Sequence, residues 1–291
     1  MIGLRLGVIA FLDVLGFKGI WNREQPRVVL DTMRRIKREG KTLQGGDHSG
    51  SLVRADGFDH RVKCVSDTVI IVVAPRGRRC TERMMYRAMY SATWIAGSIM
   101  AEALSGELPL LFRGCIGAGL MKMDGDFLIG PAVDETASQF ELSDGPFFWL
   151  SDSALSLNNE YADTFTERLE PYLMIRYAVP RKSDDPKATL VHNYFGERCR
   201  PEYWSKVRLQ IDKAFGPRPL AKEIDRKYSN TLMFLRHVET VARDTENAEL
   251  DLRVPYWDDL TSDQRLGLIK NSGVDAIKEF PRRPRPVKLF S

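Results

Sequence analysis

The chain has 291 residues, of which 43% are hydrophobic and 28% are charged. These values are typical of a globular protein with a core, in one large domain or two small ones. The formal net charge of +4 does not by itself indicate a nucleic-acid-binding protein. The longest apolar stretch with a helical pattern, residues 84–104, contains Arg87 and Glu102 and is too polar to span a membrane.

The cysteines and histidines form none of the spacings of a zinc site or a redox motif. Cys64 and Cys115 lie within apolar segments, so we expect free thiols and a reducing compartment. Asp13 interrupts the N-terminal apolar run and no small-residue cleavage site follows it, so we expect no signal peptide. These features predict a cytoplasmic protein without a membrane anchor.

The hydrophobic pattern of the first part of the chain predicts a strand, a helix and a second strand. Residues 4–15 predict the first strand, and residues 26–40 predict a helix, because Pro26 suits a first helical turn. Residues 41–60 are rich in Gly, Asp, Ser and His and predict a loop or a hairpin tip. Residues 61–75 predict one continuous second strand.

The next part repeats this alternation. Thr81 is a suitable N-cap for a helix that runs to about residue 105. Residues 110–123 predict a third strand, the sequence DGDF predicts a tight turn, and FLIG predicts a short return strand. A helix is expected from residue 130 onward.

This order of elements predicts an α+β fold, with a mostly antiparallel sheet and helices on one face. Further along, residues 172–179 predict a strand, residues 216–247 a helix, and the basic, proline-rich residues 281–290 an extended tail. No linker marks a clear boundary. We therefore expect a main domain over residues 1–195, with residues 196–291 as a helical extension packed on it.

An aspartate stands inside each of two apolar runs, Asp13 in FLDVLGF and Asp67 in VSDTVIIVV. A buried, ionised carboxylate is costly unless something pairs with it. If the two strands are neighbours, the carboxylates would repel each other, and a divalent cation between them would remove that penalty. Oxygen ligands suit Mg²⁺ or Mn²⁺. The alternative interpretation is that each aspartate caps a turn at the end of a strand.

Three further features are compatible with a phosphate-bearing ligand. The D-x-x-G-F sequence after Asp13 predicts a strand-to-helix turn with outward N–H groups, which can bind phosphate oxygens. Lys63 precedes Asp67 by an even spacing, so a regular strand would place both on one side. Arg113 carries a guanidinium fork that suits phosphate. Alternatively, Lys63 and Arg113 are ordinary surface charges.

Taken in order, the stretches FLDVLGF, VKCVSDTVIIV, FRGCIGAGL and GPAVDETASQFE resemble the class III nucleotidyl cyclases, the family of adenylyl and guanylyl cyclases. They span roughly residues 6–141, about half of the chain. The resemblance implies a ferredoxin-like core. It also implies two Mg²⁺ or Mn²⁺ ions held by Asp13 and Asp67, with the Val14 carbonyl as an additional ligand.

The same resemblance implies a nucleotide site. The turn from Val14 to Phe17, with Gly16, would hold the triphosphate, Arg113 would contact the phosphates, and Lys63 would contact the base. The ribose 3′-hydroxyl would attack the α-phosphate, with release of pyrophosphate and formation of a 3′,5′-cyclic nucleotide. The family works as dimers, so a homodimer with its sites at the interface is expected.

The chain departs from the family at positions that read the base and stabilise the transition state. Phe127 stands where ATP-using members carry a polar residue, and Lys63 replaces the usual glutamate of guanylyl cyclases. Asp134 and Ser138 stand where the family has an asparagine and an arginine. These departures resemble the pyrimidine cyclases of bacterial anti-phage signalling, the Pycsar cyclases, whose cyclic UMP or cyclic CMP is sensed by a separate effector protein.

Two residues bear on which nucleotide base the site would accept, and they leave more than one base possible. A bulky Phe127 would shrink the base pocket to the size of a pyrimidine, and Lys63 donates hydrogen bonds without accepting them. A donor favours the carbonyls of uracil, whereas cytosine N4 needs an acceptor, so we expect UTP before CTP. The alternatives are CTP, a purine nucleotide, and a non-catalytic cyclase-like module that binds nucleotide.

Other classes fit less well. Cyclic dinucleotide synthases and polymerase palms also use two carboxylates on adjacent strands, but a GGDEF-like turn is missing, and the size and mild charge do not suit a polymerase. The basic tail RRPRPVK has no stacking aromatic residues between its charges, so we expect no binding to DNA or RNA.

Overall fold

The computed structural model describes residues 4–44, 57–77, 80–124, 127–161, 169, 173–183, 185–195, 201–217 and 219–251. The chain forms two compact units, residues 1–241 and residues 242–291. In the second unit, the described residues 242–251 are the end of a helix that begins in the first. The predicted boundary at residue 195 stays a prediction, and the predicted extended tail lies outside the described residues.

The described elements follow one another in this chain order: β1 (Arg5–Val14), η1 (Phe17–Asn22), α1 (Pro26–Gln44), β2 (Phe58–Val65), β3 (Thr68–Pro75), α2 (Glu82–Ser105), β4 (Phe112–Asp124), β5 (Phe127–Ile129), α3 (Pro131–Gln139), β6 (Phe148–Leu150), α4 (Asp152–Tyr161), β7 (Met174–Val179), β8 (Lys187–His192), α5 (Pro201–Phe215) and α6 (Lys222–Asp251).

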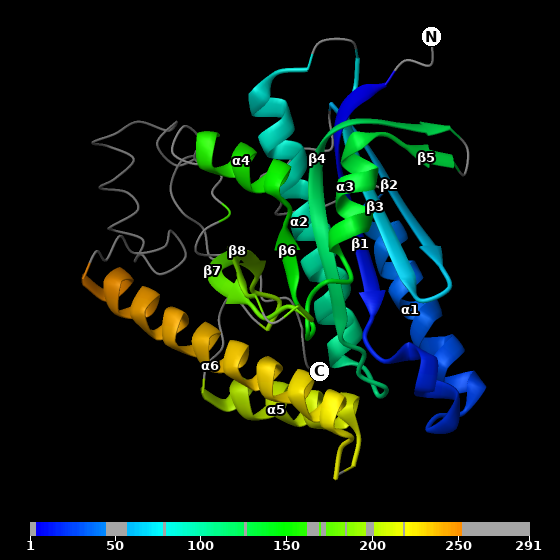
Figure 1. The fold of residues 1–291 in the computed structure, drawn as a ribbon, viewed down its shortest axis with the longest axis vertical. Coiled ribbons are helices and arrows are strands. Elements are labelled where there is room, and N and C mark those ends of the chain that lie inside the picture. Colours follow the sequence, from blue (N-terminus) through cyan, green and yellow to red (C-terminus); the bar gives the residue numbers. More distant parts are fainter. Residues whose placement is uncertain are drawn as a thin grey trace, which may run out of the picture. The chain divides into compact units, whose positions relative to one another are not determined.

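The first unit is built around one mixed sheet with the strand order β2-β3-β1-β4-β6-β8-β7, and β5 pairs with β4 (Figure 1). All pairs are antiparallel except β4 with β6. The elements from β1 to β4 follow the order βαββαβ, and their strands lie in the order β4-β1-β3-β2, which is the ferredoxin-like arrangement. The predicted α+β fold with an antiparallel-rich sheet is confirmed.

Helices cover both faces of the central strands. Residue Gly40 of α1 lies against Val62 of β2 and Ile99 of α2, on the sheet face that also carries Ala10 of β1. The opposite face carries Ile9, which packs with residues of α3. Helices α1 and α2 therefore lie on one face, as predicted, but the prediction is wrong for the shorter α3, which packs on the opposite face.

The second predicted strand is wrong in one respect: residues 61–75 form parts of two strands. Strands β2 and β3 pair antiparallel, with Val65 opposite Thr68, so Ser66 and Asp67 form a two-residue hairpin turn. Ser66 has a φ of 55°, and it is the one non-glycine residue with positive φ among the described residues. A serine in this conformation gives no sequence signal of the kind that Asn-Gly or Asp-Gly gives.

The C-terminal half contains elements that the hydrophobic pattern did not predict. Strand β6 has only three residues, all buried, and a parallel pairing with β4 extends the sheet there. The predicted strand 172–179 is β7, which pairs with β8, and the predicted helix 216–247 is α6. Helix α6 packs on this end of the sheet through Phe234, whose ring lies 4.9 Å from that of Tyr177 and 5.4 Å from that of Phe147.

Gly97 lets α2 approach β8 closely. An added Cβ at Gly97 would lie 2.2 Å from Cε1 of His192, a buried β8 residue whose side chain packs against α2. Burial lowers the pKa of His192 to about 3, so the ring is neutral at physiological pH. The neutral ring occupies the space that any larger residue at position 97 would need.

We predict that Gly97→Ala lowers the free energy of unfolding by about 2 kcal/mol, because the methyl group overlaps the imidazole. In a His192→Ala background the same substitution is expected to be neutral or slightly stabilising, since alanine favours a helix over glycine. Urea denaturation of the four proteins measures both effects. An equal loss in both backgrounds would show that the clash with His192 is not the cause.

Candidate functional site

Asp13 lies near the end of β1, and its side chain forms an ion pair with Arg113 of β4. The guanidinium donates from Nε and Nη2 to the same carboxylate oxygen, Oδ2, at 3.0 Å and 2.9 Å. The two side chains are 12% and 15% exposed, so water screens the pair only partly. Asp13 stands opposite Arg113 in the β1–β4 register and opposite Thr68 in the β1–β3 register, which places all three side chains on one face.

The other oxygen of Asp13 is much less engaged. Thr68 Oγ1 donates to Oδ1 at 3.5 Å, the outer limit of a hydrogen bond. Burial raises the pKa of Asp13 above its usual range, the hydrogen bond and charge of Arg113 oppose this shift, and the charges of Asp67 and Glu141 add to it. Burial is thus the main cause of the raised pKa of Asp13, and Arg113 offsets it only in part.

Asp67 lies in the β2–β3 turn, and not inside a strand as predicted. Its carbonyl accepts a hydrogen bond from Val14 N–H at 3.1 Å, which ties the turn to the end of β1. No hydrogen bond runs the other way, from Asp67 N–H to the Val14 carbonyl, among these described residues. The turn thus brings the Asp67 carboxylate beside the end of β1. The Val14 carbonyl accepts no hydrogen bond from Asp67 and can still serve as a ligand.

The turn after β1 has the shape that the D-x-x-G-F sequence predicts. Gly16 has a φ of 74°, a left-handed conformation that favours glycine, and the 3₁₀ helix η1 follows at once. The N–H of Val14 binds Asp67 and that of Leu15 binds the Leu111 carbonyl at 2.7 Å. In contrast, the N–H groups of residues 16–18 have no acceptor within the described chain. The unused donors are therefore at residues 16–18, and they include Gly16 and Phe17 of the predicted phosphate-binding turn but not Val14 and Leu15.

Lys63 and Phe127 occupy different places relative to this cluster. Lys63 pairs with Ile70, which pairs with Phe11, so Lys63 shares the sheet face that carries Asp13. Phe127 begins β5 opposite Asp124 and is 77% exposed. Asp124 follows Arg113 by eleven residues along β4, or roughly 36 Å at the usual strand rise. The structure does not bring Phe127 to Asp13 within one chain.

The donor set at the end of β1 suits a hard divalent cation. The carboxylates of Asp13 and Asp67 and the carbonyl of Val14 are all oxygen donors, the type that Mg²⁺ and Mn²⁺ prefer. The part of the chain that the structure describes holds no cluster of three or more His, Cys, Asp or Glu side chains. A cation here would therefore depend on these two carboxylates, backbone oxygen, and oxygens of a bound ligand.

Sequence reasoning missed two residues of this cluster, Thr68 and Glu141. Thr68 follows Asp67 directly, and the hairpin register is what points it at Asp13. The Glu141 carbonyl accepts from Arg113 Nη1 at 3.5 Å, and its carboxylate lies 4.0 Å from Nη2. Glu141 comes just after α3, and no local sequence pattern connects it with Arg113.

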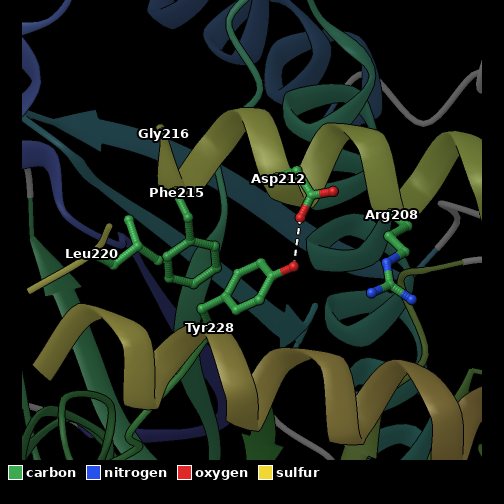
Figure 2. A pocket seen from close by; sticks show the side chains of 6 residues that line it. All are labelled: Arg208, Asp212, Phe215, Gly216, Leu220 and Tyr228. Carbon is green, nitrogen blue, oxygen red and sulfur yellow. Dashed lines mark hydrogen bonds between the residues drawn. The ribbon is translucent and has the colours of Figure 1, made fainter. Parts of the chain in front are cut away.

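A cavity of about 460 Å³ lies elsewhere, between α5 and α6 (Figure 2). It is lined by Arg208, Asp212, Phe215, Gly216, Leu220 and Tyr228. None of the predicted site residues lines it, and Tyr228 closes part of it by donating a hydrogen bond to Asp212 at 2.6 Å. This cavity is separate from the cluster at Asp13.

The described helices include none that is long and apolar enough to cross a membrane.

No protein-family model and no curated protein matches this chain. Solved structures do, at low identity. A monomeric guanylyl cyclase domain of the RhoGC fusion protein from the aquatic fungus Blastocladiella emersonii is 13% identical, with a TM-score of 0.44 over 60% of this chain and 91% of that one. A bacterial light-regulated adenylyl cyclase is 13% identical, with a TM-score of 0.40 over 72% of this chain and 99% of that one.

A third structure, an adenylate/guanylate cyclase/hydrolase from Silicibacter pomeroyi, is 13% identical, with a TM-score of 0.37 over 65% of this chain and 95% of that one. Likenesses of this size do not assign an activity or a substrate.

The Asp13–Arg113 pair predicts a specific coupling. Arg113→Gln should lower the free energy of unfolding by about 3 kcal/mol in the presence of a chelator, because it leaves a buried carboxylate without a cation. Adding Asp13→Asn should restore most of that loss, since the amide carries no charge. Urea denaturation at pH 7 gives the double-mutant cycle. Strictly additive losses would contradict a direct pair.

Proposed function

We propose that this chain is a metal-dependent nucleotidyl cyclase, which converts a ribonucleoside triphosphate to its 3′,5′-cyclic monophosphate and pyrophosphate. The observation that carries the proposal is the cluster at the end of β1. There, the Asp13 and Asp67 carboxylates lie beside a turn with unused N–H groups at residues 16–18, and Arg113 stands within contact of Asp13. The sequence resemblance to class III cyclases covers the same residues.

Each part of this cluster has a task in the proposed reaction. When bound, two Mg²⁺ or Mn²⁺ ions held by Asp13, Asp67 and the Val14 carbonyl would lower the pKa of the 3′-hydroxyl and neutralise phosphate charge. The N–H groups around Gly16 and Phe17 would bind the triphosphate oxygens. Once Asp13 no longer needs it, the Arg113 guanidinium would turn to the phosphates, where its fork suits their oxygens.

The bond changes follow from this positioning. The ribose 3′-oxygen bonds to the α-phosphorus, the bond from that phosphorus to the oxygen bridging to the β-phosphate breaks, and the hydroxyl proton passes to solvent. Holding the 3′-oxygen in line with the leaving pyrophosphate supplies most of the rate, together with stabilisation of the phosphate charge. Asp134 and Ser138 cannot supply a cation, so Arg113 carries more of that stabilisation than in a cyclase with an arginine on α3.

UTP is the proposed substrate, with CTP as the alternative. Lys63 lies on the face that carries Asp13, and its ammonium group can donate to uracil O4 or O2. Phe127 is 77% exposed at the β4–β5 hairpin, which supports a homodimer in which this side chain reaches the base site of the partner subunit. The predicted pocket-narrowing role of Phe127 therefore becomes a contribution across the dimer interface.

The biological setting rests on the sequence resemblance. A pyrimidine cyclase of this type would produce a second messenger in bacterial anti-phage defence, and a separate effector protein would sense it. A cytoplasmic location suits this role, and the described cysteines Cys64, Cys80 and Cys115 are free thiols.

A non-catalytic nucleotide-binding module is the second candidate. It is favoured by the replacement of the family asparagine and arginine by Asp134 and Ser138, and by the engagement of Arg113 with Asp13. The two candidates differ in turnover, because only the cyclase releases pyrophosphate.

The test is a product assay with ATP, GTP, CTP and UTP, each with Mn²⁺, resolved by mass. We expect UTP to give cyclic UMP and pyrophosphate, and Asp13→Asn or Asp67→Asn to lower the rate about a thousandfold, because each removes a charged metal ligand. Asp59→Asn is the matched control, since Asp59 pairs with Arg5 and Arg76 at the other end of the β2–β3 hairpin.

Cyclic AMP as the main product would retain the cyclase and overturn the pyrimidine argument. Nucleotide binding without any product would favour the binding module. Equal losses in Asp59→Asn and Asp67→Asn would show that the carboxylates act only through the fold.

A further inference from the structure

The segment between α3 and β6, residues 140–147, contacts the strand that carries Arg113 at two points. Near its start, Glu141 accepts a hydrogen bond from Arg113 Nη1 through its carbonyl and places its carboxylate 4.0 Å from Nη2. At its end, the Phe147 carbonyl accepts from Gly114 N–H at 2.8 Å. The position of this segment therefore sets the surroundings of the Arg113 side chain.

Asp144, in the middle of the segment, is 2% exposed, and α6 provides the partners of its carboxylate. Arg226 forms an ion pair with Oδ2 through Nε, and Asn230 Nδ2 donates to the same oxygen at 3.2 Å. Asn230 also donates to the Asp144 carbonyl at 2.7 Å. Within the described chain, no residue outside α6 bonds to this carboxylate.

Helix α6 is held by α5, and α5 in turn contacts the chain just after η1. Tyr228, between Arg226 and Asn230, donates to Asp212 of α5, which joins the two helices into a hairpin (Figure 2). Arg23, just after η1, donates from Nη1 to the Ala214 carbonyl near the end of α5 at 3.3 Å. The α5–α6 hairpin thus contacts both the 140–147 segment and Arg23, the residue that follows η1.

Stability alone does not account for the Asp144 network. Burying a carboxylate costs several kcal/mol, and the pairing that offsets this cost often leaves little net gain. The aromatic contacts of Phe234 already hold α6 against Phe147 and Tyr177. Backbone hydrogen bonds from Asp144 N–H to the Pro180 carbonyl at 2.8 Å and from Lys182 N–H to the Leu142 carbonyl at 3.0 Å also hold the segment. The ion pair and the two amide hydrogen bonds add a direct link between the segment and α6.

We propose that Arg226 and Asn230 are positioning residues for the nucleotide site. Through Asp144 they hold the 140–147 segment, and through Glu141 and Gly114 this segment limits the directions in which the Arg113 side chain can turn from Asp13 toward the triphosphate. The C-terminal helical hairpin is then a part of the nucleotide site's support. This inference rests on the proposed function of that site.

The test is a double-mutant cycle on nucleotide affinity, which needs no turnover. The probe is α,β-methylene-UTP, which cannot lose pyrophosphate, titrated with Mn²⁺ present into the full chain by calorimetry. Arg226→Gln is expected to weaken binding about tenfold in the otherwise unchanged protein and less than twofold in an Arg113→Gln background. Because Arg226 and Arg113 bond to different residues, independent effects would multiply instead.

Two further variants separate positioning from folding. Arg226→Lys keeps the charge but loses the fork, so it should fall between the wild type and Arg226→Gln. Asp144→Asn keeps the size of the side chain and should reproduce the loss if Arg226→Gln does not fold. Arg236→Gln removes one exposed positive charge from the same helix and is the matched control, expected to bind as the wild type does.

Equal losses from Arg226→Gln in both backgrounds, or no loss in either, would overturn the positioning role while nucleotide binding by the wild type stands. If the wild type binds no nucleotide, the proposed function itself fails, and the positioning role fails with it.

Discussion

The arrangement of side chains at the end of β1 depends on one largely buried ion pair, between Asp13 and Arg113. The Asp13 carboxylate lies in an apolar strand, and its burial is tolerated because Arg113 donates two hydrogen bonds to one of its oxygens. The pairing depends on the register of β1 with β4, which places residues 100 positions apart directly opposite each other. Thr68, the β2–β3 turn and the turn at Gly16 all meet at this point.

This pair also explains how the arginine proposed to bind phosphate and the carboxylate proposed to bind a metal can stand side by side. Both need an opposite charge, and in the described structure each serves as the other's partner. A cation at Asp13 and a triphosphate at Arg113 would replace that pair with two separate ones. In the proposed function, the contacts of Glu141 and Asp144 would orient the Arg113 guanidinium once it leaves Asp13.

Local patterns were sufficient to predict the α+β fold with an antiparallel-rich sheet, whereas the ferredoxin-like core was implied by the family resemblance. Local patterns also predicted the α2 N-cap at Thr81, which accepts a hydrogen bond from Met84 N–H, and the glycine turn after Asp13. They failed where distant pairing decides the result. Ser66–Asp67 was missed as a turn because strand register, and not a turn-forming glycine, imposes it. The Asp13–Arg113 contact, the exposure of Phe127 and the Asp144–Arg226 pair each depend on elements that come together only in the folded chain.

The central claim is that Asp13 is shared between Arg113 and a divalent cation. Calorimetric titration of Mn²⁺ into the nucleotide-free protein tests it most directly. The account predicts that Arg113→Gln binds Mn²⁺ about tenfold more tightly than the wild type, because a competing positive charge is gone, and that Asp13→Asn binds at least tenfold more weakly. Unchanged affinity in both folded variants would contradict it, and would leave the ion pair as a purely structural feature.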